Sequence, residues 1–89
     1  MKSRTARQFR ELFRALPKQT QRQAREAYQW FLLDHRHPGL RFKQVRAVPP
    51  LWSARVGIGY RAVGVVARDT IVWFWIGSHS DYDKLLRQM

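Results

Sequence analysis

The chain has 89 residues, of which 45% are hydrophobic and 13% aromatic, so it can build one small globular domain but not two. Thirteen arginines and four lysines face six acidic residues, and the resulting net charge of +11 makes polyanions, either nucleic acid or an acidic protein, the expected partners. The absence of cysteine excludes disulfides and thiolate metal sites, and no apolar run approaches the roughly 20 residues of a membrane-spanning helix.

Residues 1–7 are basic and lack the apolar core of a secretory signal, which indicates a cytoplasmic protein.

The first half of the chain predicts a helical hairpin over roughly residues 4 to 35. Two sets of apolar residues then follow at the i, i+3, i+4 and i+7 spacing of amphipathic helices: Phe9, Leu12, Phe13 and Leu16, and Ala24, Ala27, Tyr28 and Phe31. Pro17 suits the first turn of the second helix, and Pro38 and Gly39 end it.

After Gly39 the chain changes to short runs rich in valine, isoleucine and aromatic residues, which predict four antiparallel strands: Leu40–Val45, Leu51–Val56, Tyr60–Val66 and Thr70–Ile76. The last run is apolar at almost every position, so it is expected to be a central strand covered on both faces. Helical spacing returns at Tyr82, Leu85, Leu86 and Met89.

The predicted fold is therefore a single α+β domain over residues 1–89. An N-terminal helical hairpin packs on a four-stranded antiparallel sheet, and a short C-terminal helix packs back on that sheet. Six residues are expected to be buried: Phe9, Leu12, Phe13, Phe31, Val63 and Val72.

Basic residues are interleaved with aromatic residues through the predicted strands. The basic set is Arg41, Lys43, Arg46, Arg55, Arg61 and Arg68, and the aromatic set is Trp52, Tyr60, Trp73 and Trp75. Arg41 and Lys43 have the same parity and are expected to project from one face. Such a face can stack bases on its rings and pair phosphates with its guanidinium groups. Solvation, or pairing with Asp69, Asp81 and Asp83, is the alternative for any single arginine.

The histidines differ in their surroundings. His35 and His37 stand at a helix exit and are interpreted as structural, with no further ligands to support a metal site. His79 follows the apolar strand and begins the last helix, where it can transfer a proton near neutral pH, bind a phosphate, or only cap or pack. Tyr82 either belongs to the core or keeps its hydroxyl in a groove.

Taken together, these residues resemble the RelE/ParE superfamily of bacterial toxins, and the C-terminal part is nearest to HigB-like members. The resemblance covers most of the chain: Phe9 and Leu16-Pro17 in the hairpin, the run Leu40–Lys43, the segment Trp52–Val63, and the ending Trp75–Leu85. Its most specific part is the Arg-x-Gly-x-x-Tyr-Arg stretch at residues 55–61, between the hairpin and the last strand.

The resemblance implies a type II toxin. RelE- and HigB-like members cut messenger RNA in the ribosomal A site without a metal, by making the ribose 2′-hydroxyl attack the adjacent phosphate. The implied activity is thus a cofactor-independent endoribonuclease that inhibits translation. The implied partners are a cognate antitoxin, the ribosome and mRNA, with no membrane.

The resemblance also assigns roles by position. Arg61 is similar to the strand arginine that holds the scissile phosphate, and Arg55 to the basic residue on the preceding strand. His79 stands where the family has a catalytic basic residue, and Tyr82 matches a C-terminal tyrosine that stacks on a base or assists proton transfer. Two further residues are expected to contact backbone phosphates: Lys43 and Arg46.

The alternatives also come from the family. ParE members share much of this fold and poison DNA gyrase, and a matching arginine occurs in them, so Arg61 alone does not separate nuclease from gyrase inhibitor. A noncatalytic RNA-binding module is the third reading. Most relatives open with a strand, whereas here only Met1–Arg4 precedes the predicted helix. The sheet is therefore expected to lack an edge strand, and an acidic antitoxin segment to cover that bare edge or the basic face. RNA sequence preference, antitoxin identity and oligomeric state stay open.

Overall fold

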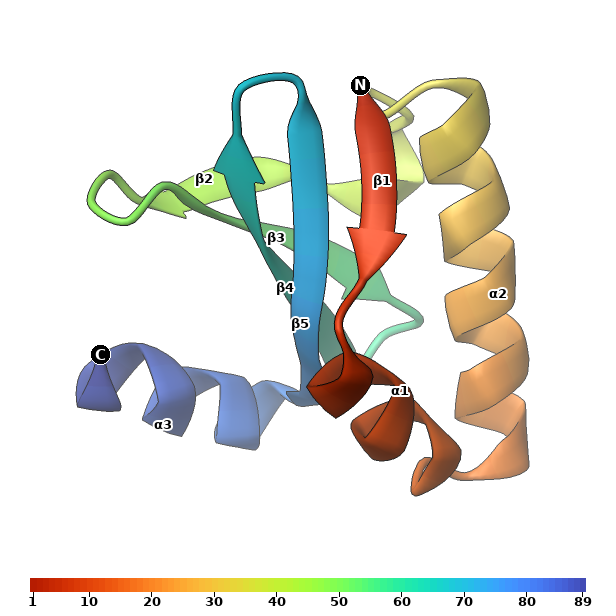
Figure 1. Cartoon of the computed structure of the whole chain (residues 1–89). Helices are drawn as coiled ribbons and strands as arrows, with labels where there is room; N and C mark the ends of the chain where they lie inside the picture. Colours follow the sequence, from red (N-terminus) through yellow and green to blue (C-terminus); the bar gives the residue numbers. More distant parts are fainter.

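A five-stranded sheet separates the helical hairpin from the C-terminal helix in this computed structural model, which describes residues 1–89 (Figure 1). The sheet order is β1-β5-β4-β3-β2. The elements along the chain are β1 (Lys2–Thr5), α1 (Arg7–Arg14), α2 (Lys18–Leu33), the 3-10 turn η1 (Pro38–Leu40), β2 (Lys43–Arg46), β3 (Leu51–Val56), β4 (Tyr60–Ala67), β5 (Thr70–Ser78) and α3 (His79–Gln88).

Strand β1 corrects the expected four-stranded antiparallel sheet and the expected bare edge. It lies at the edge of the sheet and pairs in parallel with β5, with Lys2 opposite Thr70 and Thr5 opposite Trp73. The Lys2 N–H donates to the Asp69 carbonyl at 2.8 Å, which continues the pairing past the end of the strand. The N-terminal residues are polar, so only their distant partner β5 makes them a strand. The α+β class and the C-terminal helix are confirmed.

The helix and strand boundaries differ in detail from those expected. The hairpin begins at Arg7 and ends at Leu33, because residues 2–5 belong to the sheet. The predicted start of the second strand, at Leu40, is wrong, since Leu40 ends η1 and β2 begins at Lys43. Strand β5 extends two residues beyond Ile76, to Ser78. None of the helices is both long and apolar enough to cross a membrane.

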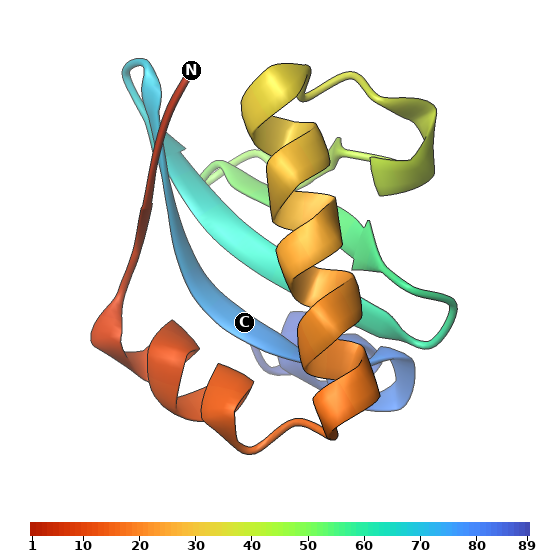
Figure 2. The same cartoon turned by 90° about the vertical axis from the view of Figure 1, so that its right-hand side faces the viewer.

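The core has two parts, one on each face of the sheet. On the hairpin face, α2 crosses the strands beside β1 and α1 (Figure 2), and Phe31 packs edge-on against Trp73 with ring centroids 5.4 Å apart. On the other face, Tyr82 of α3 packs with Leu51 and Val63. Strand β5 serves both parts, as expected for a strand covered on both faces, because its side chains alternate between the two faces. An extra residue, Phe74, in its pairing with β4 shifts this alternation, so that Phe74 and Trp75 both pack on the side of α3.

The predicted core is correct in two of six positions. Phe31 and Val63 are buried, with 5% and 0% of their surface exposed. Val72 is half-buried, and so are the three apolar residues of α1 that were expected inside: Phe9, Leu12 and Phe13. Helix α1 has no fully buried residue, because it packs along the border of the sheet rather than across it.

Candidate nucleic-acid interface

Arg55 and Arg61 lie directly opposite each other on β3 and β4. Both project from the face that carries α3, since they alternate along their strands with Ala54 and Ala62 of the hairpin-side core. The Arg55 Nε donates to the Gly57 carbonyl at 3.0 Å, which holds its side chain near the β3–β4 turn. Like charges directly opposite on a sheet repel each other, so this pair favours an anion placed between or above the two guanidinium groups.

The guanidinium of Arg61 is partly enclosed. Its Cζ lies 5.9 Å from the centroid of the Tyr82 ring, and its Nη1 is buried without a hydrogen-bond partner. A buried donor left unpaired costs roughly 1–3 kcal/mol. The other two guanidinium nitrogens are not enclosed and have no hydrogen-bond partner in the chain, so they can donate to an anion, which makes Arg61 the strongest candidate for a phosphate contact.

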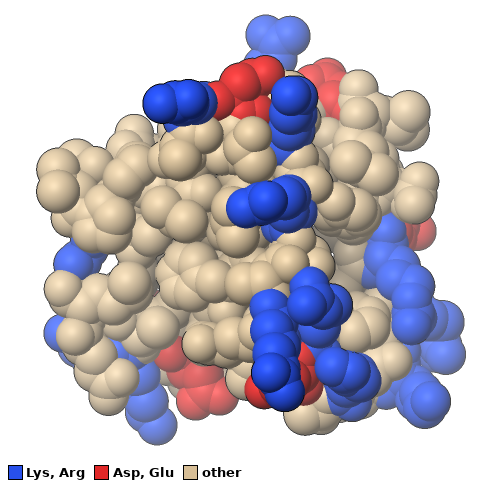
Figure 3. Space-filling model, in the orientation of Figure 1, with Lys and Arg blue, Asp and Glu red and all other residues tan.

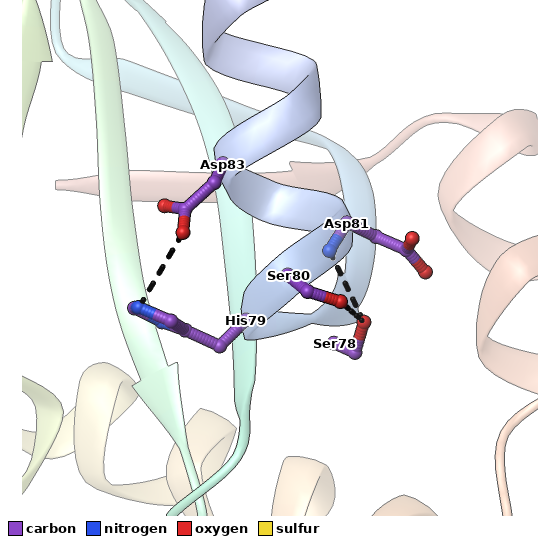
Figure 4. Close-up of polar contacts among 5 residues, drawn as sticks. All are labelled: Ser78, His79, Ser80, Asp81 and Asp83. Atoms are coloured by element: carbon purple, nitrogen blue, oxygen red, sulfur yellow. Dashed lines mark hydrogen bonds and ion pairs between the residues drawn. The ribbon is translucent and has the colours of Figure 1, made fainter.

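His79 lies at the same end of the sheet. It is the first residue of α3, and its backbone N–H donates to the Gly59 carbonyl in the β3–β4 turn at 2.8 Å. The Ser78 hydroxyl caps the helix by accepting from the Asp81 N–H at 3.2 Å (Figure 4). The imidazole is exposed, with its Nε2 3.9 Å from a carboxylate oxygen of Asp83. The His79 side chain is therefore accessible to a ligand.

The Tyr82 ring lies close to both Arg61 and His79. Its ring centroid lies 5.9 Å from that of His79, and its side chain is only 7% exposed. The ring packs with Leu51 and Val63, as the spacing of α3 predicted for a core residue. The structure thus brings four predicted site residues together: Arg55, Arg61, His79 and Tyr82.

The other predicted contacts are dispersed. Trp52 lies on the hairpin face, stacked on Phe42 with ring centroids 4.8 Å apart, so the expectation that it shares a face with the basic residues is wrong. Arg41 lies outside the strand with φ 45°, so its expected parity with Lys43 does not hold. Lys43 is exposed on the edge strand β2, opposite Ser53 on the face of α3.

Arg46 is occupied by the protein itself. Its guanidinium donates to the Leu86 carbonyl at 3.1 Å and to the Met89 carbonyl. Basic side chains commonly bind the free carbonyls at the end of a helix. Arg46 therefore holds the C-terminal end of α3 against the sheet, a contact that spacing in the sequence did not predict.

Ser53 was missed by sequence reasoning. It is fully buried, its hydroxyl has no hydrogen-bond partner, and it lies two residues from Arg55 on the same face of β3. A serine in a strand is ordinarily read as facing solvent. Its parity with Leu51 was the available signal that it faces the core around α3.

The positive charge is not neutralised within the chain. Two arginines form ion pairs, Arg7 with Glu11 and Arg36 with Asp34, and both pairs are exposed. Pairing of strand arginines with Asp69, Asp81 and Asp83 is therefore not observed. Basic side chains also gather over α1 and along α2, at the lower right of Figure 3. No three acidic or histidine side chains are grouped closely enough to hold a metal ion.

Comparison with known proteins identifies a family. Residues 18–84 match the family model of the ParE-like toxin domain. No curated protein sequence is significantly similar to the chain.

Solved structures share the fold at low sequence identity. The complex of archaeal RelE with RelB from Pyrococcus horikoshii OT3 aligns with a TM-score of 0.67 and 18% identity, over 86% of this chain and 92% of that one. A copper-bound mutant toxin from Helicobacter pylori gives 0.61 and 16%, over 91% and 97%. The RelBE2 toxin–antitoxin complex from Mycobacterium tuberculosis gives 0.59 and 22%, over 90% and 92%.

Proposed function

Because the chain belongs to the family of ParE-like toxin domains, within the RelE/ParE superfamily, we propose that it is the toxin of a type II toxin–antitoxin system and cleaves messenger RNA on the ribosome. The observation that carries this proposal is the opposed pair Arg55 and Arg61 with the exposed imidazole of His79 at its edge. Two fixed cations can stabilise the charge on the phosphoryl oxygens, and an exposed imidazole can transfer a proton, as cleavage by a ribose hydroxyl needs.

The proposed reaction rearranges bonds within the RNA and moves two protons, one through His79 and the other through solvent water. The 2′-oxygen forms a bond to the adjacent phosphorus while the bond from phosphorus to the 5′-oxygen breaks. A base removes the 2′-hydroxyl proton, and an acid protonates the leaving 5′-oxygen. Arg61 and Arg55 stabilise the charge that develops on the phosphoryl oxygens, and His79 carries one of the two proton transfers.

The proposed partners follow from the family and from the charge. Two of the structurally similar proteins are complexes of a toxin with its antitoxin, which supports a cognate antitoxin for this chain. The ribosome and mRNA are the proposed polyanionic partners, since the net charge of +11 favours binding to densely spaced phosphates. The proposed location is the cytoplasm, where both are found.

A second candidate, inhibition of DNA gyrase, has one observation in its favour. The matching family model is that of ParE-like toxin domains. A gyrase inhibitor needs the basic surface but no proton transfer.

Brief induction of the chain in growing cells separates these functions. We expect new 5′ ends inside translated mRNA within minutes, before any change in DNA integrity, and their loss when Arg61→Ala is induced to the same level. Double-strand breaks in DNA without new RNA ends would replace the nuclease by a gyrase inhibitor. If neither new RNA ends nor DNA breaks appear and the chain binds RNA in extracts, a noncatalytic RNA-binding module would be the remaining function.

The role of Tyr82 is tested by removing only its hydroxyl. Tyr82→Phe keeps the ring that packs with Leu51 and Val63, so we expect the free energy of unfolding to change by less than about 0.5–1 kcal/mol and mRNA cleavage to continue at the parental rate. A rate about 100-fold lower in the folded variant would instead assign proton transfer to the hydroxyl.

A further inference from the structure

The turn between β3 and β4 contacts two parts of the candidate site. It consists of residues 57–59 and lies at the end of the sheet that carries the arginine pair and His79. The Gly57 carbonyl accepts from the Arg55 Nε at 3.0 Å. The Gly59 carbonyl accepts from the backbone N–H of His79 at 2.8 Å. One short turn therefore contacts both a cation of β3 and the first residue of α3.

Gly57 has a backbone conformation that favours glycine. Its φ of 58° lies in the left-handed region, and no other glycine of the chain has a positive φ. A residue with a Cβ is strained in this conformation, because the Cβ approaches the backbone carbonyl oxygen. The backbone geometry in which the Gly57 carbonyl binds Arg55 is thus one that a larger residue adopts only under strain.

Helix α2 packs on this turn from the hairpin side. A Cβ on residue 57 would lie 2.5 Å from the Oε1 of Gln23 and 2.9 Å from its Cδ, so the Gln23 amide fills the space that a side chain at this position would need. Figures 1 and 2 both show the turn beside the N-terminal half of α2. Gln23 is half-buried there, and it limits movement of the turn toward the helix.

These contacts connect α2 to the candidate site. Gln23 contacts Gly57, Gly57 binds the Arg55 side chain, and the next residue but one binds the start of α3. Because these contacts meet within three consecutive residues, a shift of the turn displaces the Arg55 guanidinium and the His79 backbone together. A displacement of about 1 Å in a group that binds the reacting phosphate can lower a rate by about 100-fold.

We propose that Gly57 and Gln23 are positioning residues of the RNA-cleaving site. Gly57 fixes the Arg55 guanidinium through its carbonyl, and Gln23 fixes Gly57 through packing. Neither residue takes part in the chemistry, which stays with the arginine pair and His79. The effect on cleavage rests on the proposed function, whereas the positioning itself rests on the contacts of the turn and is measurable without RNA.

Gly57→Ala tests the position of the turn. At saturating toxin we expect the single-turnover rate of mRNA cleavage on programmed ribosomes to fall by about 10–100-fold. The toxin concentration that gives half of the maximal rate should change by less than about threefold, because all basic side chains remain. Partial unfolding would do the reverse, since it raises that concentration and leaves the maximal rate unchanged.

Gly59→Ala is the matched control. It adds the same methyl group to the same turn, but a Cβ on residue 59 would meet no atom within 4 Å beyond its chain neighbours, and the φ of Gly59 is not positive. The variant also keeps the backbone carbonyl that binds the His79 N–H. We expect its maximal rate to stay within about twofold of the parental rate.

The support from α2 is tested at Gln23. Gln23→Ala should lower the maximal rate by about 3–10-fold. Gln23→Met keeps an unbranched side chain of similar length and should retain the parental rate within about twofold. Gln19→Ala, at an exposed position one turn earlier on α2, is the control. In the double variant, Gln23→Ala should restore at least about threefold of the rate lost in Gly57→Ala, because the new methyl group no longer meets the amide.

Nuclear magnetic resonance tests the positioning without RNA. In the parental chain, the Nε–H proton of Arg55 should exchange with water at least about tenfold more slowly than that of the exposed Arg68, because it is donated to the Gly57 carbonyl. Gly57→Ala and Gln23→Ala should accelerate the Arg55 exchange by at least about threefold, and Gly59→Ala should leave it unchanged.

Three results would overturn the proposal. Equally fast exchange at Arg55 and Arg68 in the parental chain would mean that Gly57 does not hold Arg55 in solution. Parental cleavage rates in folded Gly57→Ala and Gln23→Ala would separate the turn from catalysis. Equal losses in Gly57→Ala and Gly59→Ala would attribute the effect to any added methyl group.

Two further outcomes keep this proposal distinct from the nuclease. If Gly57→Ala does not fold, Gly57→Asn replaces it, since asparagine adopts the left-handed conformation more readily. If the parental chain cleaves no mRNA but its slow Arg55 exchange is accelerated in Gly57→Ala and Gln23→Ala, the nuclease is rejected and the positioning of Arg55 is retained. Cleavage by a chain with fast Arg55 exchange would reject the positioning and retain the nuclease.

Discussion

Replacement of Arg61 by alanine is expected to lower the single-turnover rate of mRNA cleavage on programmed ribosomes by about 10²–10³-fold at every pH, as does the loss of one fixed charge-stabilising donor in other enzymes. The structural reason is that Arg61 is a half-buried cation without a carboxylate partner, beside a second cation on the opposite strand. Arg68→Ala is the matched control, because it removes the same charge from an exposed turn between β4 and β5.

His79→Ala separates proton transfer from charge. If His79 transfers a proton, the variant should lose about 10²–10⁴-fold in rate and also change the pH dependence of cleavage, whereas Arg61→Ala changes the rate alone. The exposed imidazole makes a large loss of stability unexpected for His79→Ala. Folded Arg61→Ala and His79→Ala variants that cleave at the parental rate would refute the nuclease mechanism and favour the gyrase or binding-only function.

Phe31→Ala is expected to lower the free energy of unfolding by about 3–5 kcal/mol, measured by urea denaturation. The Phe31 ring is 5% exposed and packs edge-on against both Phe42 and Trp73, at 5.2 and 5.4 Å between centroids. Its loss would leave a cavity where α2 crosses the sheet.

Phe13→Ala provides the comparison. Phe13 is half-buried at the border of a groove that lies between the helical hairpin and the sheet, so its truncation should cost about half as much, near 1.5–2.5 kcal/mol. A loss below about 1 kcal/mol for Phe31→Ala would contradict the assignment of α2 to the core. A loss for Phe13→Ala as large as that for Phe31→Ala would mean that the groove is closed in solution.

Local pattern predicted most of the elements. The periods of 3.6 and 2 identified both helices of the hairpin, three of the five strands nearly to their ends, and α3. Each of these elements buries one stripe or one face, so its apolar residues recur at a regular spacing along the sequence. Strand β1 has no such repeat. Its residues Lys2–Thr5 become a strand because β5, almost 70 residues later, offers them a free edge.

The resemblance to the toxin family indicated Arg55, Arg61 and His79 as site residues, and the structure shows why they come together. Arg55 and Arg61 flank a short turn, so antiparallel pairing brings them together, and His79 follows a strand that runs beside Arg61. Trp52 was placed on the wrong face, because the apolar neighbours of β3 occupy both faces and its own parity was ambiguous. Arg46 was assigned to RNA, although its guanidinium binds carbonyls of α3, some 40 residues away.

The sequence by itself determined the fold class, the basic character and the clustering of Arg55, Arg61 and His79, since these depend on composition, on periodicity and on neighbours joined by short turns. Only the tertiary structure decided the edge strand β1, the burial of Tyr82 and the groove beneath α2. Each of these arises where segments distant in the chain meet. A four-residue polar strand is stable only on a preformed sheet, and alanines that are unremarkable in two separate elements become a groove only when a helix crosses the strands above them.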